Sequence, residues 1–140
     1  MDPIRVILID DQVLFVESLK TLLATSYSDI QVVASYYSAR EAIDEIRTVN
    51  PQVVVLDMRM PQISGAEACK LLLQEKPELH VMILTTFDND EYVLEALKAG
   101  AEGYLLKDVN PSFLVDAIRS ISGGGVLMSP AIAQKVVSRV

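Results

Sequence analysis

Four short hydrophobic runs in this chain each end at a polar side chain that can take part in chemistry. The runs occupy residues 6–9, 53–56, 81–84 and 104–106. In the same order, they are followed by Asp10 with Asp11, Asp57, Thr85 and Lys107. Such runs are typical of parallel strands buried on both faces, and open α/β sheets bind ligands beyond the carboxyl ends of their strands. The sequence therefore predicts three carboxylates, a hydroxyl and an ammonium around one crevice, a combination suited to phosphoryl chemistry.

The three carboxylates favour a metal site. Asp10, Asp11 and Asp57 would lie at adjacent strand ends, where their negative charges repel one another unless a cation lies between them. Mg²⁺ prefers a few oxygen ligands and keeps several waters, and no His or Cys stands beside these acids to favour zinc. We therefore predict Mg²⁺ here, with Mn²⁺ as a substitute. Asp11 has a second interpretation, compatible with the first, as the N-cap of the first helix.

Asp57 is the candidate nucleophile, because a carboxylate can accept a phosphoryl group and form an aspartyl-phosphate. Phosphoryl transfer depends on positioning and on neutralising the charge of the phosphoryl oxygens. Lys107 would supply a positive charge and Thr85 a hydroxyl donor. Taken singly, these two residues are also consistent with a surface lysine and a strand-end hydroxyl. Their combination with the acids is what indicates phosphoryl transfer.

The segments between the hydrophobic runs position these residues. A further strand is predicted at 30–35, and hydrophobic residues at helical spacing follow each of the five strands. Strands joined by helices are parallel, and the helices cover both faces of the sheet. The fold class is therefore α/β, a (βα)₅ flavodoxin-like three-layer sandwich with the strand order 2-1-3-4-5. The second and fifth strands are shorter and more polar, and we expect them at the edges.

Helix boundaries are indicated by capping residues. Ser38 with Glu41, and Ser64 with Glu67, have the spacing of capping boxes. The remaining boundary signals are the acidic stretch 88–91, Gly100, and Asn110 followed by Pro111.

Composition excludes several classes of protein. The 140 residues are enough for one domain, and a net charge of −7 without a basic cluster argues against nucleic-acid or membrane-surface binding by this segment. No hydrophobic stretch approaches the roughly 18 residues of a membrane span, and the first residues lack a signal-peptide pattern. The single Cys69 excludes an internal disulfide and is predicted to be a small core residue. We expect a cytoplasmic protein.

From about residue 5 to 121, the chain resembles a response-regulator receiver domain of the chemotaxis-regulator type. The matching residues are Asp10-Asp11, Asp57 with Met60-Pro61 after it, Thr85 and Lys107. The stretch 100–108 and the Gly-rich segment before Ser129-Pro130 are similar to the NarL/FixJ subfamily. The chain departs from the wider family in having Asp108, rather than proline, after Lys107.

The resemblance implies the following metal ligands. Asp11 would bind Mg²⁺ directly, whereas Asp10 would act through water. The phospho-acceptor Asp57 and the backbone carbonyl of Arg59 would complete the set of protein ligands.

The resemblance also implies a conformational switch. Thr85 would be drawn toward the phosphoryl oxygens and would vacate space behind it. Tyr104 would then rotate inward to fill that space, or it is a static packing residue. The change would alter the surface of the fourth helix, fifth strand and fifth helix, where a dimer partner would bind.

The partners implied by the resemblance are a sensor histidine kinase as phosphoryl donor and a second copy of the chain on phosphorylation. Promoter DNA would be bound through a C-terminal helix-turn-helix absent from this sequence, and no membrane is involved. Such a domain is not a turnover enzyme, although it catalyses its own phosphotransfer and a slow autodephosphorylation. A stand-alone phosphorylation-switched interaction module remains an alternative to transcriptional control.

The last residues form a separate segment in this interpretation. A receiver domain is predicted over 1–122, and a Gly-rich hinge with a linker helix over 123–140. Ser129-Pro130 has the form of an N-cap with a first-turn proline, and the helix would carry a hydrophobic stripe that includes Ile132, Val136, Val137 and Val140. The stripe needs a partner, either an absent output domain or the receiver domain itself.

Two other classes share the architecture. A haloacid-dehalogenase-type phosphatase also uses an aspartate nucleophile with Mg²⁺, but in an Asp-x-Asp pattern after the first strand. A flavodoxin-like binding module would need a phosphate loop rich in Ser, Thr and Gly after that strand, which this chain lacks. The absence of G-x-x-x-x-G-K-[ST] excludes a P-loop nucleotidase.

Overall fold

The structure is a parallel sheet between two layers of helices. It is a computed structural model, and it describes residues 2–125, 127–128 and 130–138. The strands are β1 (Ile4–Ile9), β2 (Ile30–Tyr36), β3 (Val53–Leu56), β4 (His80–Thr85), β5 (Gly103–Leu106) and β6 (Leu127–Met128). The helices are α1 (Val13–Ser26), α2 (Ala39–Val49), α3 (Gly65–Glu75), α4 (Asp90–Lys98), α5 (Pro111–Ser122) and α6 (Pro130–Ser138).

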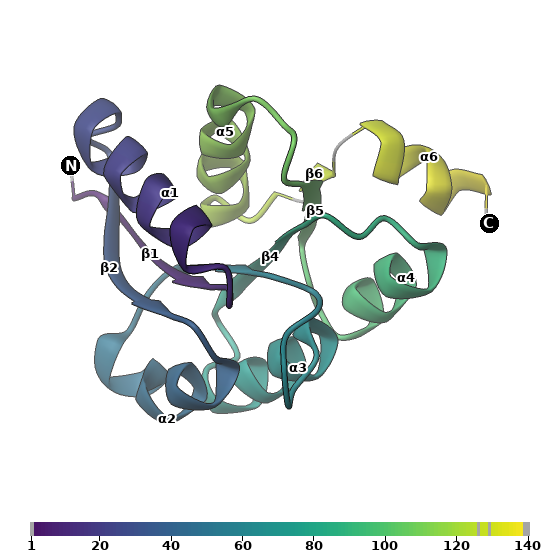
Figure 1. Ribbon diagram of the computed structural model, residues 1–140, viewed down its shortest axis with the longest axis horizontal. Coiled ribbons are helices and arrows are strands. Elements are labelled where there is room, and N and C mark those ends of the chain that lie inside the picture. The colour runs from purple at the N-terminus through teal and green to yellow at the C-terminus, as the bar shows by residue number, and fades with distance from the viewer. Residues whose placement is uncertain (1, 126, 129, 139–140) are drawn as a thin grey trace.

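Side chains of the strands alternate between two hydrophobic cores. Helices α1 and α5 cover one face of the sheet, and α2, α3 and α4 cover the other (Figure 1). The core under α1 and α5 includes, from the strands, Val6, Leu8, Val53, Val55 and Leu105. The core on the other face includes Ile7, Ile9, Leu56, Ile83 and Tyr104, together with Cys69 from α3. Burial on both faces explains why the strands are hydrophobic at successive positions, and it confirms Cys69 as a core residue.

The strand order β2-β1-β3-β4-β5 is confirmed, with all neighbours parallel. The prediction that the fifth strand is an edge is wrong. The two-residue strand β6 pairs in parallel with the outer side of β5, opposite Gly103 and Tyr104. The backbone of Tyr104 is therefore linked to the segment that leads into α6.

Helix α6 packs against α4, as Figure 1 shows at the C-terminal end of the chain. Ile132 has no exposed surface and belongs to the core on the α4 side, and Val136 is partly buried against it. Val137, in contrast, is 73% exposed. The hydrophobic stripe thus finds part of its partner on the same domain, whereas Val140 and the predicted N-cap at Ser129 lie outside the described residues.

The capping predictions are only partly correct. The hydroxyl of Ser64 accepts a hydrogen bond from the backbone N–H of Glu67, and Asn110 caps α5 through the N–H of Ser112. Ser38 occupies the N-cap position of α2, but its side chain makes no capping hydrogen bond there, so the predicted capping box is absent. After α4, Gly100 adopts a φ of 108°, a left-handed conformation that favours glycine.

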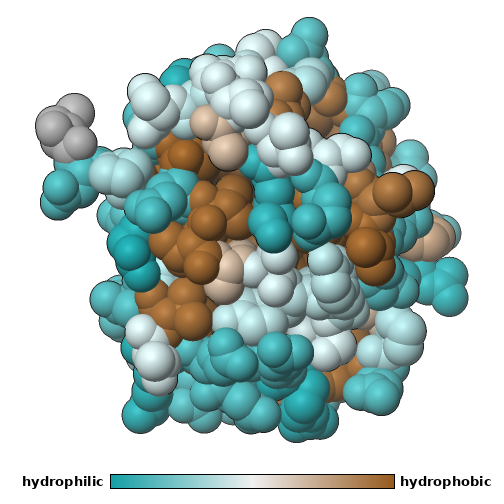
Figure 2. Space-filling view, turned by 60° about the vertical axis from the view of Figure 1, so that its left-hand side comes forward, coloured by the Kyte–Doolittle hydropathy of each residue, from teal (hydrophilic) through white to brown (hydrophobic). Residues whose placement is uncertain are grey.

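The side of the molecule that lies at the left in Figure 1 carries its hydrophobic residues in separate patches between polar ones (Figure 2). Scattered patches are normal on protein surfaces. This side therefore gives no indication of a large docking surface.

Candidate functional site

The two buried acids of the site lie side by side because of the strand register. Ile9 of β1 pairs with Leu56 of β3, so the next residues, Asp10 and Asp57, come together at the carboxyl ends of the strands. Asp10 is 4% exposed and Asp57 is 5% exposed, whereas Asp11 is exposed. One carboxylate oxygen from each of the three residues lies within 4.8 Å of the others.

Lys107 brings its ammonium into the same group. Its Nζ lies 2.6 Å from Asp10 Oδ2 and 3.5 Å from Asp57 Oδ2, and its side chain is 8% exposed. The ammonium also lies 4.3 Å from the centre of the Phe15 ring, a cation–π contact. The structure therefore places one buried positive charge against two buried carboxylates.

Burial raises the pKa of Asp10 above its usual range, and the neighbouring charge of Asp57 acts in the same direction. The hydrogen bonds from Lys107 and from the backbone N–H of Gln12 oppose this increase. A second cation at the acids would oppose it further, because positive charge stabilises the ionised carboxylate.

The segment after Asp57 is held close to the acid. The backbone N–H of Met58 donates to Asp57 Oδ1 over 2.8 Å, and the N–H of Gly65 donates to the carbonyl of Met58 over 2.7 Å. A Cβ on Gly65 would lie 2.4 Å from the carbonyl oxygen of Asp57, closer than any side chain can approach. Glycine is therefore required where the start of α3 meets the end of β3.

A hollow of about 520 Å³ opens over the acids, with Asp11 and Asp57 in its lining. The remaining lining residues are Gln12, Arg59, Met60, Pro61, Thr86 and Phe87. The Arg59 guanidinium lies 5.0 Å from the centre of the Phe87 ring, so these two side chains contact each other at the hollow. Asp57 is thus next to a space that a phosphoryl group can enter.

Thr85 and Tyr104 do not join the acids directly. Successive side chains of a strand point to opposite faces of the sheet. By this alternation, Thr85 and Tyr104 lie on the face covered by α4. The opposite face, covered by α1 and α5, is the one to which Asp10, Asp57 and Lys107 belong. Thr85 has no exposed surface, and its Oγ1 accepts a weak hydrogen bond of 3.4 Å from the Phe87 N–H.

Tyr104 is already directed inward. It has no exposed surface, and its hydroxyl donates to the Phe87 carbonyl oxygen over 2.5 Å. The ring is therefore inward in this structure, as expected for the packing alternative, and its rotation on phosphorylation stays a prediction. Tyr104 and Thr85 share a partner residue, Phe87, that lines the hollow.

Asp11 is not the N-cap of the first helix, which was the second interpretation given for it. The N-cap residue of α1 is Gln12, and its side chain makes no capping hydrogen bond. Instead, the backbone N–H of Gln12 donates to Asp10 Oδ1, and its side-chain Oε1 accepts from Lys107 Nζ over 2.6 Å. Gln12 is not among the residues predicted for the site, since no local pattern marks it apart from its place directly after the acidic pair.

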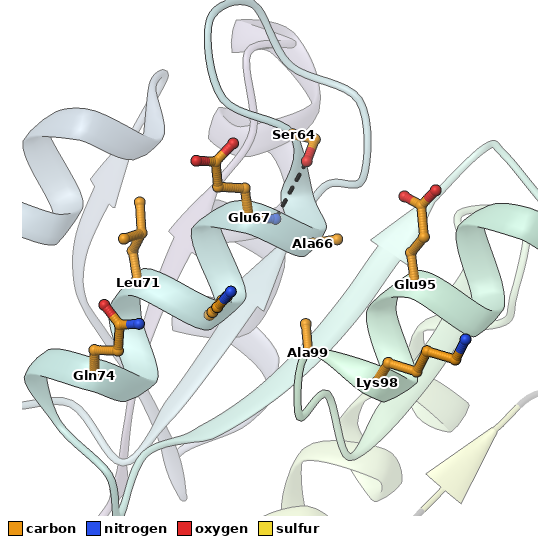
Figure 3. Close-up of a pocket in the computed structure, with 9 residues that line it drawn as sticks. Ser64, Ala66, Glu67, Leu71, Gln74, Glu95, Lys98 and Ala99 are labelled. Atoms are coloured by element: carbon orange, nitrogen blue, oxygen red, sulfur yellow. Dashed lines mark hydrogen bonds between the residues drawn. The ribbon is translucent and has the colours of Figure 1, made fainter.

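A second hollow, of about 680 Å³, lies between α3 and α4 (Figure 3). Its lining residues are Ser64, Ala66, Glu67, Lys70, Leu71, Gln74, Glu95, Lys98 and Ala99. The hydroxyl of Ser64 is already used as a helix cap, as the dashed line in Figure 3 shows. None of the acids of the candidate site lines this hollow, and we assign it no chemistry.

The acids fit a divalent metal ion by their geometry and chemistry. Their oxygens converge within the 4.8 Å already given, and the set is made of carboxylates without His or Cys, which suits Mg²⁺ rather than zinc. Arg59 lines the same hollow, and its role as a backbone-carbonyl ligand stays a prediction.

Among the described residues, no helix has the length and hydrophobicity needed to cross a membrane.

Comparison with curated proteins identifies relatives over nearly the whole chain. It is 34% identical to the transcriptional regulatory protein DegU of Brevibacillus brevis over 96% of this chain and 56% of DegU. It is 39% identical to the uncharacterized transcriptional regulatory protein YxjL of Bacillus subtilis over 98% of this chain and 62% of YxjL. The chain thus spans less than two thirds of the length of these relatives.

Comparison with solved structures gives the same family. A LuxR-family two-component response regulator from Aurantimonas superposes with a TM-score of 0.91 at 33% identity, covering 99% of this chain and 98% of that one. The signal receiver domain of the putative response regulator NarL from Mycobacterium tuberculosis superposes with a TM-score of 0.82 at 30% identity, covering 89% and 99%. The family described as the response regulator receiver domain matches residues 6–119. With its fold, its strand-end acids and these matches, the chain belongs to the response regulator receiver domain family.

Proposed function

We propose that Asp57 accepts a phosphoryl group from the phosphohistidine of a sensor histidine kinase, in a reaction that requires Mg²⁺. The observation that carries this proposal is the convergence of three carboxylates within 4.8 Å of one another, with the Lys107 ammonium beside two of them. An open hollow next to Asp57 leaves room for the donor. Bound Mg²⁺ would neutralise phosphoryl charge, and Asp10, Asp11, Asp57 and the Arg59 carbonyl would hold it.

In the transfer, a carboxylate oxygen of Asp57 attacks phosphorus, and the bond between phosphorus and the donor imidazole nitrogen breaks. The electron pair of that bond goes to the imidazole, which takes up a proton. Lys107 offers positive charge to the phosphoryl oxygens, and Thr85 would offer its hydroxyl after leaving the Phe87 N–H. Slow attack by water on the same phosphorus would return free Asp57 and inorganic phosphate, so the domain is a switch with a limited lifetime rather than a turnover enzyme.

The proposal is tested by intact-mass measurement after incubation with acetyl phosphate and Mg²⁺. We expect wild-type protein to gain the mass of one phosphoryl group, and expect EDTA or the substitution Asp57→Ala to prevent the gain. Asp44→Asn, which replaces an exposed acid on α2, serves as a matched control and should label normally. Undiminished labelling of Asp57→Ala would exclude Asp57 as the acceptor.

We further propose that the phosphorylated domain forms a homodimer and controls transcription through a C-terminal helix-turn-helix that binds promoter DNA. The names of DegU and YxjL as transcriptional regulatory proteins, and the length by which they exceed this chain, support the second step. Residues 1–122 would then be the receiver domain, and 123–140 the hinge and linker helix. We propose the cytoplasm as its location, where a kinase can phosphorylate its histidine from ATP.

The dimerisation step has its own test, which is light scattering before and after labelling. We expect the mass to increase on labelling of the wild type. Lys107→Ala should still take up some label but should fail to dimerise, because the charge that responds to the phosphoryl group is missing. Labelled Lys107→Ala that dimerises like wild type would contradict the proposed role of the lysine in transmitting the signal.

A further inference from the structure

The Lys107 ammonium is held on one side of the site by a residue outside the acidic cluster. Its two shortest contacts are 2.6 Å to Asp10 Oδ2 and 2.6 Å to Gln12 Oε1, whereas Asp57 Oδ2 is 3.5 Å away. The last distance is too long for a good hydrogen bond. In this state, the lysine is therefore bonded to the residue after β1 and to the residue before α1, and it makes only an ion pair with Asp57.

Gln12 is well placed to hold the lysine there. Its backbone N–H is fixed on Asp10 Oδ1 over 2.9 Å, so its side chain starts from an anchored position at the N-cap of α1. The Phe15 ring, 4.3 Å from the ammonium, lies one helical turn further along. Asp10, Gln12 and Phe15 thus surround the ammonium, and the amide oxygen of Gln12 accepts one of its three N–H donors.

A phosphoryl group on Asp57 would attract the same ammonium. Its oxygens carry more negative charge than the amide oxygen of Gln12, so they are better acceptors for an ammonium. Asp57 Oδ2 lies 3.5 Å from the ammonium, beyond a good hydrogen bond, so engaging its phosphoryl oxygens would move Lys107 away from Gln12. The free energy of the lost 2.6 Å hydrogen bond to Gln12 would then oppose that movement. An interaction made in one state and lost in the other shifts the equilibrium toward the state that has it.

We propose that Gln12 is a positioning residue that holds Lys107 at Asp10 in the resting domain. Its hydrogen bond to Lys107 lowers the net free energy gained when the lysine binds phosphorylated Asp57. This inference rests on the function proposed above. It assigns to Gln12, which also lines the hollow beside Asp57, a role in the balance between the resting and phosphorylated states.

The test uses beryllofluoride, a phosphoryl mimic, at saturating Mg²⁺, with the concentration at half-saturation followed by NMR of the backbone amides. Gln12→Met is nearly isosteric and lacks the acceptor. We expect it to lower that concentration about three- to tenfold, the range of an ordinary hydrogen bond, because solvent screens the charge at this exposed bond. Gln12→Glu keeps an acceptor and adds charge, and we expect a shift in the opposite direction. Leu14→Met, at a position 84% exposed on the same helix, is the matched control and should change little.

If Gln12 only supported the fold, both substitutions would shift the half-saturation concentration of beryllofluoride in the same direction. A second readout, made without Mg²⁺ or beryllofluoride, is the side-chain NMR signal of Lys107 in protein labelled with ¹⁵N-lysine. We expect the Lys107 ammonium signal to shift, and its protons to exchange faster with water, in Gln12→Met. An unchanged lysine signal, or an unchanged half-saturation concentration in this variant, would overturn the inference while leaving the proposed function intact. Failure of the wild-type protein to bind beryllofluoride would overturn the proposed function, and this inference with it.

Discussion

The hydroxyl of Tyr104 donates a 2.5 Å hydrogen bond to the backbone carbonyl of Phe87, and so ties β5 to the segment that follows β4. The same Phe87 donates its N–H to Thr85 Oγ1 and lines the hollow over the acids. A movement of Thr85 toward a phosphoryl group therefore has a direct route to Tyr104, through one shared residue. The backbone of Tyr104 in turn pairs with β6, which precedes α6.

Removing this hydrogen bond should destabilise the resting domain. Tyr104→Phe keeps the buried ring and leaves the Phe87 carbonyl without its donor, and we expect the free energy of unfolding to fall by about 1–2 kcal/mol. Urea denaturation measures the change. Tyr37→Phe is a matched control, since Tyr37 is 43% exposed and donates to the exposed Glu17, and its effect should stay within about 0.5 kcal/mol. Equal losses in the two variants would contradict the importance of the Tyr104 bond.

Ionisation of Asp10 should lower the thermal stability of the domain in metal-free buffer. Burial raises its pKa above the ordinary 3.8, which means that the folded state binds this proton more tightly than the unfolded chain. The stabilisation by the bound proton is complete below pH 3.8 and is lost as the pH rises through the folded pKa. Asp10→Asn imitates the protonated form, so we expect its Tm to exceed that of wild type at pH 7 and the difference to shrink as the pH falls toward 4.

Thermal unfolding between pH 4 and 7, with EDTA present, checks this pH dependence. Asp44→Asn, an exposed replacement, should not reproduce it. A Tm difference between Asp10→Asn and wild type that grows as the pH falls would contradict a raised pKa of Asp10.

The contact between α6 and α4 should contribute to the stability of the domain. Ile132 has no exposed surface, and we expect Ile132→Ala to lower the free energy of unfolding by about 2–4 kcal/mol, from lost burial and the cavity left behind. Hydrogen exchange should show loss of protection in α6 before the central strands. Val137→Ala, on the same helix but 73% exposed, provides the comparison and should change stability by under about 0.5 kcal/mol. Similar effects of both substitutions would mean that α6 does not dock through Ile132.

The order of the five long strands and the gathering of Asp10, Asp57 and Lys107 at their carboxyl ends could be predicted from the sequence, because hydrophobic runs and strand-end residues carry that information. The two-residue β6 could not, since it is too short to have a hydrophobic period and depends on β5 for its pairing. The bond between Gln12 and Lys107 joins residues 95 positions apart, and no local pattern reports it. The inward position of Tyr104 is likewise decided by tertiary packing and not by its neighbours in the chain.

Chemical location of the phosphoryl group tests the central claim most directly. Protein incubated with acetyl phosphate and Mg²⁺ is treated with borohydride, which reduces an aspartyl-phosphate to homoserine, and the peptides are then mapped by mass spectrometry. We predict homoserine at position 57, dependent on both acetyl phosphate and Mg²⁺. Full labelling of the intact protein with reduction at Asp10, Asp11 or another acid, and none at Asp57, would contradict the account.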